Sequence, residues 1–200
     1  HDINEVRRDL GQNPANMIWL WGEGQAPQLP KFKERFGVTG AAISAVDLVK
    51  GIATCLGWEN IAVPGATGYL DTDYAAKGRY AIEALKTHDL VFVHIEAPDE
   101  AAHEGEPEKK VRAIEHVDRE IIGPVADALR AGGEFRLMVL PDHFTPIQKR
   151  THSPEPVPFV MAGTGVAAKS GLAFTEANAA KTGVLISEGH RLMERFLRGV

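Results

Sequence analysis

Apolar residues along this chain occur in two patterns, short continuous runs and longer stretches with helical spacing. A continuous run of strand length indicates a strand buried on both faces, whereas apolar residues at every third or fourth position indicate an amphipathic helix. The runs predict strands at 16–21, 41–45, 60–65, 89–96, 136–141 and 157–163. The helical spacing predicts helices within 44–57, 73–88, 107–133 and 185–197.

Because strands and helices alternate along the chain, the pattern is typical of a mostly parallel sheet covered by helices. We therefore expect an α/β fold, a three-layer α/β/α sandwich, in a single domain over residues 1–200. Gly132 and Gly133 are expected to end the longest helix, and Pro124 to kink it or divide it in two.

Composition narrows the class of protein. The residues are 44% hydrophobic with a formal net charge of −5, and the basic residues are scattered, which is unlike a nucleic-acid binder. No apolar run reaches the roughly 20 residues that span a bilayer. The single cysteine, Cys55, excludes an internal disulfide and fits a reducing cytoplasm. The chain begins at His1 without a Met, so we expect a piece of a longer protein.

Polar residues suited to chemistry follow two of the predicted strands at the point where each strand ends. Asp99 and His103 come after the fourth strand, and Asp142 and His143 come after the fifth. His152 lies in the loop that leads to the last strand. Ligands bind beyond the carboxyl ends of the strands in open parallel sheets, so these side chains are expected at one edge.

Imidazole and carboxylate together suit zinc or manganese and disfavour calcium. Asp99 and His103 are four residues apart, so both can reach one ion from one face of a helical turn. The adjacent Asp142 and His143 can diverge toward separate ions. These ligands, with His152, are too many for one tetrahedral ion and too few for two, which favours two ions with further ligands elsewhere. Taken singly, each residue also fits a structural role, such as a helix-start carboxylate, a turn, or a histidine bonded to a carbonyl.

Other polar positions give weaker indications. The turn "VPGATGYLDTD" matches no phosphate-binding pattern, and a tight turn capped by Asp71 or Asp73 is the favoured interpretation. Ser44 and Thr67 lie near strand ends, without the sequence context of a nucleophile. Arg150 lies between the two histidine motifs, where it can contact phosphate or simply face solvent.

These stretches together resemble a known family, over roughly residues 10–165. "NPANMIWLWGEG", "GAAISAVDLVKGIA", "VPGATGYLDTDY", "APDEAAHEG" and "LPDHFTPIQKRTHSPEPVPF" are similar to segments of the archaeal-type cofactor-independent (2,3-bisphosphoglycerate-independent) phosphoglycerate mutases. That group belongs to the alkaline phosphatase superfamily. The resemblance implies a partial alkaline-phosphatase-like core and a cytoplasmic glycolytic isomerase that interconverts 3-phosphoglycerate and 2-phosphoglycerate through a phosphoserine.

The resemblance also implies two divalent ions, manganese or zinc, in the full-length protein. Asp99, His103 and His152 would hold one ion, and Asp142 and His143 the other. The nucleophilic serine and a further aspartate belong to an N-terminal segment of the family that nothing here matches, and an inserted lid-like domain is also missing. We therefore expect the C-terminal part of a core that holds one ion or none and is inactive alone.

Three functions fit these residues. The first is the mutase core, and the second keeps the fold and metals but acts as a phosphatase or a homoserine-kinase-like phosphotransferase. The third is a non-catalytic metal-binding module. The expected partner is a small phosphorylated substrate, with no nucleic acid and no membrane. A half-core that exposes apolar surface would also allow two copies to associate.

Overall fold

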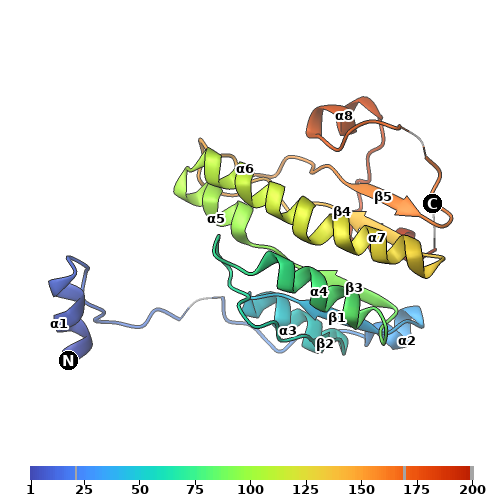
Figure 1. Cartoon of the computed structure of the whole chain (residues 1–200). Coiled ribbons are helices and arrows are strands. Elements are labelled where there is room, and N and C mark those ends of the chain that lie inside the picture. The colour runs from blue at the N-terminus through green and yellow to red at the C-terminus, as the bar shows by residue number, and fades with distance from the viewer. Residues whose placement is uncertain (21, 169, 199–200) are drawn as a thin grey trace.

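The computed structural model describes residues 1–20, 22–168 and 170–198 (Figure 1). Its strands are β1 (Gly40–Ile43), β2 (Glu59–Asn60), β3 (Leu90–Val93), β4 (Arg136–Val139) and β5 (Val160–Gly163). Its α-helices are α1 (Asp2–Asp9), α2 (Phe32–Phe36), α3 (Asp47–Leu56), α4 (Tyr74–Ala84), α5 (Ala97–Glu104), α6 (Pro107–His116), α7 (Gly123–Gly132), α8 (Glu176–Lys181) and α9 (Leu192–Arg198). A π-helical segment, η1 (Val117–Ile122), joins α6 to α7, and a 3₁₀ turn, η2 (Gly189–Arg191), leads into α9.

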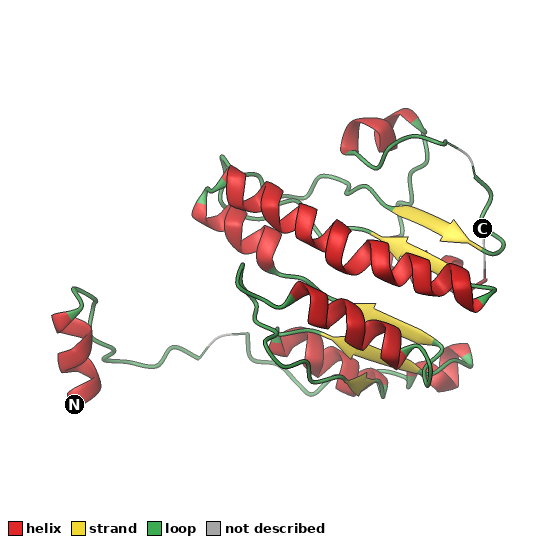
Figure 2. Ribbon diagram, in the orientation of Figure 1, coloured by secondary structure: helices red, strands yellow, loops and turns green. Residues whose placement is uncertain are grey.

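The strands form two sheets (Figure 2). In the first, β1 lies between β2 and β3, and all three run parallel. In the second, β4 and β5 pair antiparallel, with Met138 opposite Met161. The predicted α/β class with a parallel sheet is confirmed. The last strand runs against its neighbour because no helix lies among residues 140–159, all of them described, to carry the chain back for a parallel pairing.

The predicted strand at 16–21 is wrong for its described part. Residues 16–20 form no strand, and the side chains from Met17 to Leu20 are between 83% and 86% exposed. The segment belongs to an extended connection between α1 and the rest of the chain (Figure 1), so its backbone has no strand beside it to pair with. Trp21, the last residue of that prediction, lies outside the described residues.

The long helical stretch is divided, as Pro124 predicted, and the division takes the form of the π-helical η1 just before that proline. Helix α4 packs against η1 so closely that a Cβ at Gly78 would clash with the Glu120 carbonyl oxygen. Side chains of α4, η1 and α7 meet Ile43 of β1 in the main hydrophobic core. The helices on this face therefore form a continuous layer.

The other predicted helix signals also hold. Asp73 caps α4, since its Oδ1 accepts a hydrogen bond from the Ala76 backbone N–H at 2.7 Å. Gly133 ends α7 with a φ of +106°. Cys55 lies half-buried on α3 as a free thiol. Among the helices of the described ranges, none is long and apolar enough to cross a membrane.

Candidate metal centre

The first pair of predicted ligands lies on α5, which starts directly after β3. Pro98 occupies the first turn of α5, where its missing N–H costs nothing, and Asp99 and His103 follow one turn apart. Their side chains meet as the spacing predicts, with His103 Nε2 at 3.1 Å from Asp99 Oδ2. Both side chains are largely covered, since Asp99 is 20% exposed and His103 is 35% exposed.

The second group of predicted ligands lies on the loop after β4. A single antiparallel bridge between Phe144 and Ser153 folds this loop back on itself, with the Ser153 N–H donating to the Phe144 carbonyl at 3.0 Å. The bridge brings His143 beside His152, and the two rings stack with centroids 3.7 Å apart. A histidine far along the loop thus reaches the same place as one at the strand end.

The two groups converge into one constellation, here called the histidine cluster: Asp99, His103, His143 and His152. His103 Nε2 lies 3.2 Å from His152 Nε2, and His152 Nε2 lies 3.6 Å from Asp99 Oδ1. One ligand atom each from Asp99, His143 and His152 also fall within 4.8 Å of one another.

These separations fit a bound metal. Ligands 2.0–2.1 Å from a tetrahedral zinc ion are about 3.3 Å apart. The two imidazole nitrogens of His103 and His152 are 3.2 Å apart, and each lies near a different oxygen of Asp99, at 3.1 Å from Oδ2 and 3.6 Å from Oδ1. Two imidazole nitrogens facing each other at 3.2 Å also need a proton or a cation between them. The donor set therefore suits a transition metal.

Neighbouring groups fix the orientation of two of the rings. His103 Nδ1 lies 2.9 Å from the Arg150 carbonyl, so it carries the proton and leaves Nε2 free to bind a metal. Thr145, which is only 4% exposed, donates its hydroxyl proton to Asp99 Oδ1. Its oxygen lies 3.2 Å from His143 Nδ1 and can accept that ring's N–H. This orientation also directs the Nε2 of His143 away from Thr145.

Arg150 holds its carbonyl toward His103 in a strained conformation. It is the one non-glycine residue with positive φ in the described parts of the chain, at +52°. Its guanidinium packs against Gly105, where an added Cβ would lie 2.5 Å from Arg150 Nε. The side chain is exposed beside the cluster, so the contact with phosphate predicted for Arg150 stays a prediction.

Asp142 stands apart from the other predicted ligands. Its side chain is 71% exposed, and it contacts the backbone N–H of His143 at 3.0 Å and His143 Nε2 at 3.4 Å. Of the predicted ligands, four therefore converge in the histidine cluster and Asp142 lies at its margin. The division of these residues between two ions stays a prediction.

Acidic and basic groups surround the cluster. Carboxylate oxygens of Glu96, Asp99 and Glu100 lie within 4.8 Å of one another, which concentrates negative charge at this edge. Burial raises the pKa of Glu96, and the neighbouring His94 opposes the shift. Burial lowers the pKa of Lys110, whose ammonium donates to the Thr145 carbonyl at 2.9 Å. The sequence analysis did not identify Thr145 or Lys110 as part of the site. The one sequence feature that could have indicated Thr145 is its position two residues after His143.

The other candidate nucleophiles have local partners. Ser44 Oγ accepts from the Val46 N–H at 3.0 Å and lies 3.2 Å from His94 Nδ1. His94 in turn pairs with Glu96 at 3.3 Å. Thr67 donates its hydroxyl to Asp71 at 2.7 Å, within the turn that the sequence predicted. Both hydroxyls are thus engaged in holding strand ends and turns.

The cluster combines carboxylate and imidazole groups, which suit a transition metal, and they follow the carboxyl ends of β3 and β4. The chain belongs to the metalloenzyme superfamily, whose family profile, described as "Metalloenzyme superfamily", matches residues 6–197. The expectation of an alkaline-phosphatase-like metalloenzyme fold is confirmed by this match and by a solved structure of similar fold.

Relatives with a named activity are similar over the whole chain. A 2,3-bisphosphoglycerate-independent phosphoglycerate mutase from Methanothrix thermoacetophila is 53% identical over 200 residues, which are 100% of this chain and 51% of that protein. A second such mutase, from Methanothermobacter thermautotrophicus, is 53% identical over 97% of this chain and 48% of its own length. The resemblance to this group is confirmed, and the chain spans about half the length of these relatives.

Two solved structures are similar. A Pyrococcus horikoshii protein superposes with a TM-score of 0.81 at 38% identity, over 90% of this chain and 47% of that one. A cofactor-independent phosphoglycerate mutase from Thermoplasma acidophilum superposes with a TM-score of 0.63 at 26% identity, over 99% of this chain and 46% of its own.

Proposed function

We propose that this chain forms the metal-binding half of a cofactor-independent phosphoglycerate mutase, which interconverts 3-phosphoglycerate and 2-phosphoglycerate. The observation that carries the proposal is the histidine cluster, whose spacings suit a metal, in a chain 53% identical to enzymes of that name. Because the chain spans about half of those relatives, the complete activity requires residues outside these 200.

In this proposal Asp99, His103 and His152 hold one divalent ion, and His143 and Asp142 contribute to a second. Zinc or manganese fits, since both accept mixed imidazole and carboxylate ligands. A bound ion of this kind would supply Lewis acidity and offset the charge of the transferring phosphoryl group. The reducing cytoplasm is the proposed location, which suits a chain with one free cysteine.

The residues of this chain would bind and orient. Thr145 fixes the Asp99 carboxylate, and the Arg150 carbonyl fixes the His103 ring so that its Nε2 faces the cluster. The Arg150 guanidinium, which lies beside Gly105, would pair with a phosphate oxygen. The phosphorylated serine that the resemblance implies would come from outside these residues, since Ser44 and Thr67 already hold local structure.

A chimera tests the proposal. The matching half of the Methanothrix thermoacetophila mutase is replaced with this chain, and conversion of 3-phosphoglycerate is measured with zinc or manganese present. We expect mutase activity in the chimera and a loss of at least about 100-fold in its His103→Ala and His152→Ala variants, because each removes a ligand. His190→Ala, which changes a 74% exposed histidine, is the matched control and should keep full activity.

The outcomes separate the candidate functions. A folded, metal-loaded chimera that hydrolyses phosphate esters without forming 2-phosphoglycerate would replace the mutase with a phosphatase. Transfer of phosphate to another acceptor would favour the phosphotransferase. A chimera that binds metal and catalyses none of these reactions would leave a non-catalytic metal-binding module.

A further inference from the structure

A strained backbone conformation lies two residues before His152 of the histidine cluster. Arg150 has a φ of +52°, whereas the other residues with positive φ in the described ranges are glycines. Residues with a side chain rarely adopt this left-handed region, because the Cβ lies too close to the following carbonyl oxygen. Such strain persists only where surrounding contacts hold it, and it is found most often at functional sites.

The backbone at Arg150 closes a tight turn. The N–H groups of Lys149 and Arg150 both donate to the Pro146 carbonyl, at 3.0 and 2.9 Å. The left-handed residue then reverses the chain, as glycine commonly does at the end of a helix. The reversal directs the Arg150 carbonyl to His103, whose Nδ1 lies 2.9 Å away. Glycine would make the same turn without strain, so the turn by itself does not require an arginine.

The side chain of Arg150 supplies a contact that glycine would lack. Its guanidinium lies against Gly105, the left-handed C-cap of α5, where an added Cβ would fall 2.5–2.7 Å from the Nε, Nη2 and Cζ atoms. A cation at the carboxyl end of a helix also meets the negative end of the helix dipole. Arg150 therefore reaches α5 at two points, through its carbonyl at His103 and through its guanidinium at Gly105.

These two contacts join the segments that supply the facing histidines. His103 lies in the last turn of α5, and its Nε2 is 3.2 Å from Nε2 of His152 in the loop after β4. A change in the backbone of Arg150 would release the Nδ1 side of the His103 ring. It would also move the start of the segment that carries His152. The orientation of both rings thus depends on one strained residue.

We propose that Arg150 is a positioning residue for the metal, because its guanidinium, packed on Gly105, keeps the strained backbone that orients His103 and His152. We call the two contacts with α5 the Arg150 latch. This inference deepens the proposed function, since it rests on a metal bound in the histidine cluster. It does not depend on which reaction that metal serves.

The sign of the effect separates the latch from simple electrostatics. Arg150 places a positive charge beside the cluster, so removal of the charge alone should strengthen the binding of a divalent cation. Loss of the latch should weaken binding instead, because the imidazole rings lose their fixed orientation. Stability separates the latch from a general structural role, since Arg150→Gly removes the strain and the latch together.

The experiment measures zinc affinity by competition with a chromophoric chelator, and the stability of the metal-free chain by urea unfolding. We expect Arg150→Ala and Arg150→Gly to bind zinc about tenfold more weakly, at the lower end of the range for lost supporting groups, because the carbonyl itself remains. Arg150→Gly should unfold at the same urea concentration as the unchanged chain or a higher one, since glycine adopts this conformation without strain. Affinity then falls without a loss of stability.

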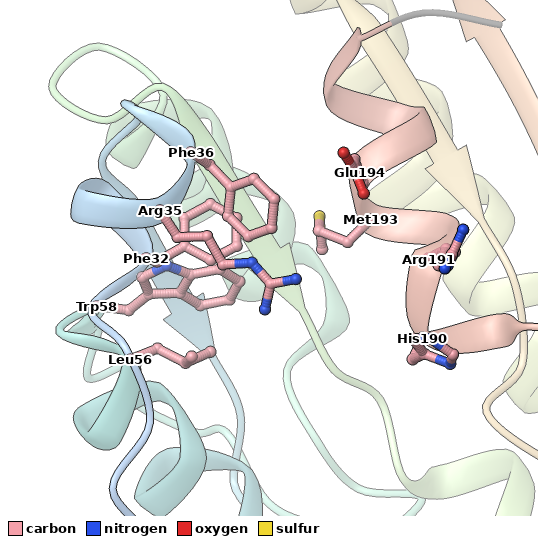
Figure 3. A pocket seen from close by; sticks show the side chains of 9 residues that line it. All are labelled: Phe32, Arg35, Phe36, Leu56, Trp58, His190, Arg191, Met193 and Glu194. Carbon is pink, nitrogen blue, oxygen red and sulfur yellow. The ribbon is translucent and has the colours of Figure 1, made fainter.

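Two variants serve as matched controls. Lys149→Ala removes the same charge one residue away, from an ammonium that is 55% exposed and pairs with Glu155 at 3.3 Å. Arg35→Ala removes another packed guanidinium, whose carbon lies 4.9 Å from the centre of the Phe36 ring. Arg35 lines a cavity of about 590 Å³ with Phe36 and Trp58 (Figure 3), at the amino ends of β1 and β2 and away from the cluster. Both variants should bind zinc within about threefold of the unchanged chain.

A double-mutant cycle tests the contact between Arg150 and Gly105 itself. Gly105→Ala places a Cβ against the guanidinium and should weaken zinc binding while Arg150 is present. In the Arg150→Ala background the same substitution should lose most of this effect, because the contact has already gone. Additive losses would show that the two residues act independently.

The His103 ring reports its orientation without any metal. Nitrogen NMR of the metal-free chain at about pH 8.5, where imidazoles are ordinarily neutral, distinguishes the two tautomers, and the signal that His103→Ala loses identifies the ring. We expect the proton on Nδ1 in the unchanged chain, because that nitrogen faces the Arg150 carbonyl. Arg150→Gly should show a mixture of both tautomers.

Four results would overturn the proposal: zinc affinity in both Arg150 variants equal to or above that of the unchanged chain, equal weakening by Lys149→Ala, additive losses in the cycle, and an unchanged His103 tautomer in Arg150→Gly. An unchanged chain that binds no zinc would overturn the metal site and its positioning by Arg150 together. Zinc binding in a chimera without mutase activity would contradict only the mutase, so the two failures are distinguishable.

Discussion

Thr145→Val tests whether the histidine cluster binds metal through an oriented carboxylate. Valine keeps the shape of threonine but replaces with a methyl group the hydroxyl that donates to Asp99 and faces His143 Nδ1. Thr145 is 4% exposed, so no water can easily replace the lost bond. A hydrogen bond to a charged group contributes about 1.5–3 kcal/mol, which corresponds to about 10- to 150-fold in affinity. Removal of a residue that hydrogen-bonds to a metal ligand typically lowers metal affinity about 10- to 100-fold, which gives the same range.

The assay is a competition titration of zinc and of manganese against a chromophoric chelator, on this chain and on each variant. We expect Thr145→Val to weaken metal binding about 30-fold, and Thr145→Ser, which keeps the hydroxyl, to restore most of it. Thr72→Val is the matched control. Thr72 is 5% exposed and accepts from the Thr67 N–H at 3.0 Å, so its loss should cost stability and leave metal affinity unchanged. An affinity of Thr145→Val within threefold of the unchanged chain would refute the reasoning.

Three further predictions concern stability. Gly105→Ala should lower the free energy of unfolding in urea by about 1–2 kcal/mol, because φ is +78° there and the new Cβ meets the Arg150 guanidinium. Metal affinity should fall with it, and a variant as stable as the parent would contradict this. Burial lowers the pKa of Lys77 below its ordinary value near 10.5. The folded state then binds fewer protons than the unfolded state between the lowered pKa and 10.5, so stability should rise with pH across that window, and Lys77→Met should abolish the rise. Two hydrogen bonds from Thr39, each 2.7 Å, lower the pKa of Asp89. The stability that Asp89 contributes is present above its unfolded pKa near 3.8 and is lost as pH falls through its lower folded pKa. In Asp89→Asn the free energy of unfolding should therefore depend less on pH in that range.

Local patterns predicted most of the elements. The apolar runs located β1, β3, β4 and β5, and the glycine, proline and aspartate signals located the ends of α4 and α7. The strands themselves are shorter than the runs, since β3 covers Leu90–Val93 of a predicted 89–96. The run at 16–21 failed because an apolar stretch becomes a strand only beside a free edge, and sequence does not show where the edges lie.

The sequence likewise predicted one part of the candidate site and not the other. Asp99 and His103 were predictable because one helical turn brings them together. The meeting of His152 with His143 was not, because it depends on the bridge between Phe144 and Ser153 across a loop without regular structure. The position of Asp142 at the margin also follows from that loop, since adjacent residues on a turn diverge and only one of the pair faces the cluster.

The sequence by itself determined the class of fold, the residue types that suit a metal and the placement of those residues after strand ends. These features depend on the spacing of residues along the chain, because the period of the apolar residues indicates which segments form helices and which form strands. Only the tertiary structure decided that four of the predicted ligands converge, that Thr145 and the Arg150 carbonyl orient two of them, and that β4 and β5 form a sheet separate from β3. The reason is physical: these features depend on contacts between segments far apart in the chain, which pack according to the space that their neighbours leave.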